Sequence, residues 1–122
     1  MDFFKEFYSI IEKFNAKRVK YAVVGGIALS FYTEPRYTKD IDILTTPSQI
    51  DKIKQILFDL DFDEASMSWT FQKTQIELFR FVKVEDEDYL PIDILVGKED
   101  WHSEVILNAK KVKSINGHVK VI

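Results

Sequence analysis

The feature that most limits how this chain can fold is an apolar segment that ends in two glycines and precedes a strand-like segment with two aspartates. The first is residues 21–24 followed by Gly25 and Gly26, and the second is Asp40-Ile-Asp-Ile43. Side chains two apart on a β-strand point to the same face, so the two aspartates share one face and the two isoleucines share the other. Neighbouring carboxylates repel each other unless a positive charge lies between them. A divalent cation is the simplest candidate for that charge.

Length and composition indicate a small globular protein. The 122 residues fit one domain, and 46% hydrophobic with 30% charged residues is ordinary for such a domain. The absence of cysteine excludes disulfides, thiolate metal sites and a cysteine nucleophile. No apolar run has the length of a membrane span and no secretory signal is present, so we expect a cytoplasmic protein. The net charge of −3 gives no general reason to bind nucleic acid.

Hydrophobic periodicity predicts an alternation of helices and strands. Helices are predicted at residues 2–17, 27–32, 46–60 and 99–109, and strands at 19–24, 39–44, 67–71, 76–84 and 90–96. The acidic run at 85–88 is predicted to be a solvated turn, and Asn116-Gly117 is a strong hairpin signal near the end of the chain. This order predicts one domain of the α/β (α+β) class, with a mixed β-sheet and helices packed against it.

Few residues in this sequence can carry chemistry. His102 and His118 lie in different predicted elements, which gives no histidine-based triad or zinc site, and the double glycine matches neither a dinucleotide fingerprint nor a P-loop. Asp93 lies in Ile-Asp-Ile-Leu, the same pattern that contains Asp42, and a carboxylate in such an apolar run is costly without a partner. Oxygen ligands on strands suit Mg²⁺, and glycines at a strand-to-helix turn let backbone amides approach a phosphate.

Taken in order, these features resemble the nucleotidyltransferase superfamily that includes DNA polymerase β. The resemblance is carried by Val24-Gly-Gly26, by Asp40-Ile-Asp-Ile43 thirteen residues later, and by Ile92-Asp-Ile94. Together with Arg36-Tyr-Thr-Lys39, the form Gly-Gly-Ile-Ala is most similar to a small bacterial branch. That branch includes the AbiEii-type toxin nucleotidyltransferases and the lincosamide and aminoglycoside nucleotidyltransferases. The resemblance implies the nucleotidyltransferase fold, with a mixed sheet and helices packed against it.

The resemblance also implies a reaction, the Mg²⁺-dependent transfer of an NMP group from an NTP to a hydroxyl acceptor. Asp40 and Asp42 would hold the Mg²⁺, or Mn²⁺ in its place, that binds the triphosphate. Asp93 would either help to bind a second metal near the acceptor or act as the base toward the acceptor hydroxyl.

Nucleotide contacts are implied for four further residues. Gly25 and Gly26 would contact the phosphates, although close packing of a helix on a strand also requires glycine. Arg36 and Thr38 would either touch the nucleotide or brace the aspartate strand, with an ion pair as the simpler role for the arginine.

The acceptor side of the site is less defined. Relatives in this branch usually continue into C-terminal helices that help to form the acceptor side of the cleft, and this sequence ends at Ile122. We therefore expect either a minimal nucleotidyltransferase domain over residues 1–122 that acts alone, or one whose cleft is completed by a protein partner or a second copy. The expected acceptor is a small molecule, an RNA end or a protein hydroxyl. The alternative is a non-catalytic or partner-dependent component of a toxin–antitoxin-type system.

Overall fold

The computed structural model describes residues 1–25, 40–65, 69–71, 74–114 and 117–122. The helices are α1 (Phe3–Ala16), the short 3₁₀ helix η1 (Pro47–Gln49), α3 (Ile50–Asp59) and α4 (Asp100–Leu107). The strands are β1 (Ala22–Val24), β2 (Ile41–Thr45), β3 (Asp63–Glu64), β4 (Trp69–Phe71), β5 (Ile76–Glu85), β6 (Asp88–Gly97), β7 (Lys110–Ser114) and β8 (Gly117–Val121). The helix predicted at residues 27–32 lies outside the described residues. Within the described ranges, no helix is long and apolar enough to cross a membrane.

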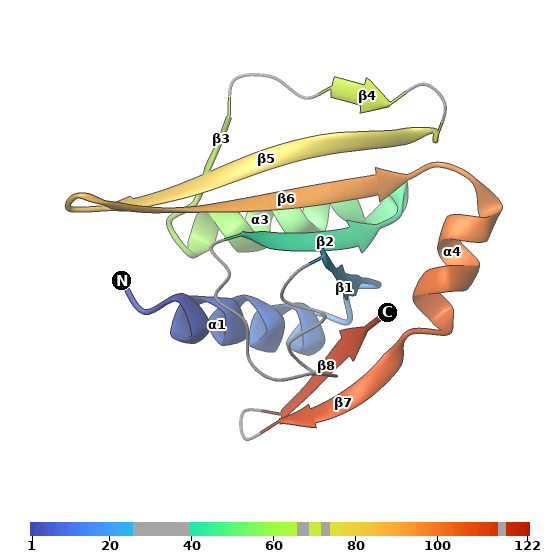
Figure 1. Ribbon diagram of the computed structural model, residues 1–122, viewed down its shortest axis with the longest axis horizontal. Helices are drawn as coiled ribbons and strands as arrows, with labels where there is room; N and C mark the ends of the chain where they lie inside the picture. Colours follow the sequence, from blue (N-terminus) through green and yellow to red (C-terminus); the bar gives the residue numbers. More distant parts are fainter. Residues whose placement is uncertain (26–39, 66–68, 72–73, 115–116) are drawn as a thin grey trace.

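The strands form one mixed sheet in the order β3-β5-β6-β2-β1-β8-β7, with β4 paired to β5. β2 runs parallel to β6 and β1 runs parallel to β8, whereas the other pairs are antiparallel. In Figure 1 the long strands β5 and β6 cross the upper part of the molecule, and α1 and α4 lie below and to the right of them. This arrangement confirms the predicted fold class, a mixed sheet with helices packed against it.

Alternating side chains divide the central strands between two apolar clusters. One face packs against α1 and α3 in a large buried cluster that includes Phe7, Phe14, Ile41, Ile43, Ile53, Leu57, Ile92 and Ile94. On the opposite face, Ala22 and Leu44 pack against Ile106 of α4 in a smaller cluster. Because Asp42 is two residues before Leu44 on β2, its side chain lies on the α4 face of the sheet. The α1 and α3 face thus forms most of the core, and the carboxylates are on the less covered face.

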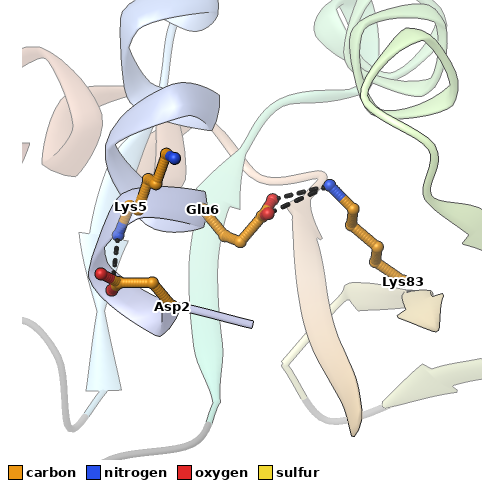
Figure 2. Close-up of polar contacts among 4 residues, drawn as sticks. All are labelled: Asp2, Lys5, Glu6 and Lys83. Carbon is orange, nitrogen blue, oxygen red and sulfur yellow. Dashed lines mark hydrogen bonds and ion pairs between the residues drawn. The ribbon is translucent and has the colours of Figure 1, made fainter. Parts of the chain in front are cut away.

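The β5–β6 hairpin extends beyond its neighbours and is tied to α1. Its two-residue turn, Asp86-Glu87, lies between Glu85 and Asp88, which confirms the predicted solvated turn. Lys83 on β5 donates hydrogen bonds of 3.1 and 2.9 Å to the two carboxylate oxygens of Glu6 on α1 (Figure 2). In the same view the Asp2 side chain caps the start of α1 by accepting from the backbone N–H of Lys5. The Lys83–Glu6 ion pair thus joins the hairpin, and with it the strand that carries Asp93, to α1.

Candidate active site

The two Ile-Asp-Ile-Leu segments become neighbours in the sheet. β2 and β6 are parallel and in register, so that Asp42 lies opposite Asp93 and the flanking isoleucines and leucines also pair with their counterparts. Adjacent strands are separated by about 4.8 Å, and residues in register point to the same face. The repeated sequence pattern therefore places two carboxylates side by side on the α4 face of the sheet.

The electrostatic consequence is strongest at Asp42. Burial raises the pKa of this half-buried carboxyl above its ordinary value, and the negative charges of Asp93 and Asp40 raise it further. The positive charge of Arg80 opposes these effects without cancelling them. Asp40, exposed and immediately before β2, thus acts on Asp42 through its charge. Among the described residues, the charges of Asp93 and Asp40 thus act on Asp42 more strongly than the charge of Arg80 does.

Gly25 lies against Asp42 on the β1 side of the site. Val24 pairs with Asp42 across the antiparallel β1–β2 ladder, and Gly25 follows with a left-handed φ of +73°. A Cβ atom added to Gly25 would lie 2.5 Å from Oδ2 of Asp42. Only glycine combines this backbone conformation with such a close approach to the carboxylate.

The structure adds one residue that sequence reasoning missed, Arg80 on β5. It pairs with Asp93 across the β5–β6 hairpin, where Nε donates to Oδ1 at 2.7 Å and Nη2 donates to Oδ2 at 2.9 Å. Hydrogen bonding and charge from Asp93 raise the pKa of Arg80, and Asp40 and Asp42 add to this. A signal was present in the sequence, because Arg80 is six residues before the hairpin turn at Asp86-Glu87 and Asp93 is six residues after it.

The predicted site residues therefore divide into two groups. Gly25, Asp42 and Asp93 lie together, and Asp40 is next to them, whereas Gly26, Arg36 and Thr38 lie outside the described residues. Within the described part of the chain, no three His, Cys, Asp or Glu side chains gather closely enough to hold a metal ion. The metal-binding role of the three aspartates stays a prediction.

Neither of the two histidines contributes to this site. His102 is buried at the start of α4, where its Nδ1 accepts a 3.1 Å hydrogen bond from the backbone N–H of Glu99. Gly97 lies against it so closely that an added Cβ would be 2.3 Å from Cγ of His102. His118 is an exposed residue of β8. The role of His102 is thus to cap and pack α4.

Comparison with known proteins decides the family. The family model described as a nucleotidyltransferase of unknown function (DUF6036) matches residues 2–88. The chain belongs to this nucleotidyltransferase family. The matched region contains Gly25, Asp40, Asp42 and Arg80 and ends before Asp93.

Solved structures with the nucleotidyltransferase fold agree with this assignment. A crystal structure from Thermotoga maritima, provisionally assigned as a nucleotidyltransferase, is 14% identical with a TM-score of 0.71, covering 98% of this chain and 76% of that chain. The lincosamide antibiotic adenylyltransferase LnuA, bound to lincomycin, is 17% identical with a TM-score of 0.60, covering 97% and 78%. A further provisional nucleotidyltransferase, from H. pylori, is 11% identical with a TM-score of 0.52, covering 95% and 51%. No curated protein sequence matches the chain. These likenesses confirm the fold expected for this family.

Proposed function

We propose that this protein transfers an NMP group from a nucleoside triphosphate to a hydroxyl acceptor, with Mg²⁺ or Mn²⁺ held by Asp42, Asp93 and Asp40. The observation that carries this proposal is the parallel register that pairs Asp42 with Asp93 beside the close backbone of Gly25. Membership of a nucleotidyltransferase family supports the reaction class.

The chemistry of the donor set fits a hard divalent cation. Carboxylate oxygens are the ligands that Mg²⁺ and Mn²⁺ prefer, and strands hold them more rigidly than loops do. Burial and the charges of Asp93 and Asp40 raise the pKa of Asp42 even though Arg80, a described cation, lowers it. A bound divalent cation would add positive charge there, neutralise the triphosphate and favour ionisation of the acceptor hydroxyl.

The remaining roles follow from the order of the strands. On the β1 side of Asp42, Gly25 brings bare backbone close to the carboxylate. Gly25 and Gly26 would contact the phosphates through their backbone amides, and Arg36 and Thr38 would add nucleotide contacts. Asp93 lies on the other side, toward β5. There it would accept the acceptor's proton or help to hold a second cation as the acceptor oxygen attacks the α-phosphorus and pyrophosphate leaves.

The acceptor is proposed only as a class. LnuA is by name an adenylyltransferase of lincosamide antibiotics. For this chain we propose a small molecule, an RNA end or a protein hydroxyl as the acceptor. A protein partner or a second copy would complete the acceptor side.

The test is to incubate the protein with each α-³²P-labelled NTP, Mg²⁺ or Mn²⁺, and a cell extract, and to identify what becomes labelled. Asp42→Asn and Asp93→Asn are expected to lower transfer by roughly 100-fold or more. Asp63→Asn, which changes an exposed carboxylate on β3, is the matched control and should keep full activity. Metal-dependent nucleotide binding that is unchanged in Asp42→Asn would contradict the proposal. A stable protein complex without any labelled acceptor would favour the non-catalytic, partner-dependent alternative.

A further inference from the structure

We infer that Arg80 is an exchangeable counter-ion of Asp93. Arg80 would pair with this carboxylate until a divalent cation binds, and the cation would then replace it. The ion pair and the bound cation would exclude each other. This inference rests on the proposed function, because it assigns Asp93 to the cation site.

The geometry of the pair places Arg80 in competition with a cation. Its guanidinium engages both carboxylate oxygens of Asp93, at 2.7 and 2.9 Å, in a fork that matches the carboxylate plane. A Mg²⁺ ligand oxygen lies about 2.0–2.1 Å from the metal, so a cation on Asp93 would be brought close to the guanidinium. A cation bound to either oxygen would take one of the two positions that the guanidinium now occupies, and repulsion between the two positive groups would weaken the ion pair.

Burial shows which partner is able to move. The Asp93 side chain is 13% exposed, whereas the Arg80 side chain is 46% exposed. Arg80 is therefore the more solvent-exposed partner and the one that we expect to move. The other hairpin ion pair is different, because the side chains of Lys83 and Glu6 are only 17% and 18% exposed. We therefore expect the Lys83–Glu6 ion pair to persist and the more exposed Arg80–Asp93 ion pair to dissociate more readily.

The strand order explains why Arg80 is an incomplete substitute for a cation. The three strands lie in the sheet in the order β5-β6-β2, so Arg80 and Asp42 lie on opposite sides of Asp93. Arg80 compensates Asp93 directly, whereas it acts on Asp42 only through its charge and from two strands away. A divalent cation between Asp42 and Asp93 would compensate both, and this difference favours the exchange.

The experiment measures Mn²⁺ binding to the full chain without nucleotide, by calorimetry or by the decrease of the free Mn²⁺ electron paramagnetic resonance signal. Arg80→Ala is expected to bind Mn²⁺ about 10-fold more tightly than the wild type, because no guanidinium has to be displaced. Arg80→Lys is expected to fall between them, since lysine keeps the charge but loses the fork. Lys98→Ala is the matched control, because it removes the same charge from an ion pair with Glu77 and should leave Mn²⁺ affinity unchanged.

The outcomes separate this inference from the proposed function. If the wild type binds Mn²⁺ and Asp93→Asn does not, but Arg80→Ala binds equally or more weakly than the wild type, then Arg80 orients Asp93 and the exchange is wrong. If neither the wild type nor Arg80→Ala binds Mn²⁺, the metal site itself is wrong and both proposals fall. Thermal unfolding gives a second readout, because Arg80→Ala should gain a larger increase in Tm on Mn²⁺ addition than the wild type. An equal gain in Tm would also overturn the exchange.

Discussion

At the scale of single residues, Gly25 shows how closely the backbone approaches the carboxylates. Its φ of +73° is unfavourable for any residue with a Cβ, and that Cβ would lie 2.5 Å from Oδ2 of Asp42. We predict that Gly25→Ala lowers the free energy of unfolding by about 2 kcal/mol, part from backbone strain and part from displacing the carboxylate. Urea unfolding of the metal-free protein measures this loss.

A double-mutant cycle separates the two parts of the Gly25 effect. In an Asp42→Ala background the carboxylate is gone, so Gly25→Ala should cost only the backbone term of about 1 kcal/mol. The same cost in both backgrounds would show that Gly25 and Asp42 are energetically independent.

Residues differ in how far the sequence alone reveals them. Asp42 and Asp93 could be predicted because each interrupts an apolar run, and a buried carboxylate needs an explanation wherever the strand lies. Arg80 could not be assigned in the same way, because its partner is set by the position of the hairpin turn, and an arginine on a strand is unremarkable until that register is known. The two carboxylates that the sheet pairs were therefore recognisable in the sequence, whereas the Arg80 partner of Asp93 was not.

At the scale of secondary-structure elements, the parallel pairing of β2 and β6 places Asp42 beside Asp93. We expect this pairing to make the free energy of unfolding depend on pH. The folded pKa of Asp42 is raised above the ordinary value of 3.8, so the native state binds a proton more readily than the unfolded chain does. Stability is therefore lost as pH rises from 3.8 through the raised pKa, and is restored on acidification. We predict that Asp42→Asn, measured in EDTA, is more stable than the wild type at pH 7 by less than about 1 kcal/mol, or up to roughly 4 °C in Tm, because water screens part of the charge effect at this half-buried group.

The comparison with lower pH makes this prediction specific. At pH 3 both side chains are neutral, so the stabilising effect of Asp42→Asn should nearly vanish. Asp63→Asn on β3 is the control and should change stability by less than about 0.5 kcal/mol at either pH. If Asp42→Asn were less stable than the wild type at pH 7, the carboxylate would be held by favourable contacts instead. The variant predicted to lose activity is thus predicted to gain stability.

The elements themselves were largely predictable, with deviations that have local causes. The helix predicted at 2–17 is α1, and the hairpin around residues 85–88 is present. The strand predicted at 19–24 is shorter, because ladder pairing begins only at Ala22, opposite Leu44, although Val19 and Tyr21 are already buried. The helix expected from residue 46 begins as a 3₁₀ turn, where Gln49 turns back to accept a 3.0 Å hydrogen bond from the backbone N–H of Lys20.

At the scale of the whole molecule, the site depends on strands that come from distant parts of the chain. Gly25 and Asp42 belong to the first half, and Arg80 and Asp93 belong to one long hairpin that joins the sheet beside β2. The position of Asp93 relative to Asp42 therefore depends on what holds this hairpin against the core. One such contact is the ion pair between Lys83 and Glu6 (Figure 2).

We predict that Glu6→Gln lowers the free energy of unfolding by about 1–2 kcal/mol, because it leaves a mostly buried Lys83 ammonium without its carboxylate. Glu64→Gln is the matched control. The side chains of Lys54 and Glu64 are 36% and 43% exposed, so their ion pair should contribute no more than about 0.5 kcal/mol. Urea unfolding followed by far-ultraviolet circular dichroism measures both. Adding 1 M NaCl should further weaken the small Glu64 effect and leave most of the Glu6 effect, since salt screens exposed pairs more strongly. Equal, small losses for the two variants would show that the Lys83–Glu6 ion pair contributes little to holding the hairpin.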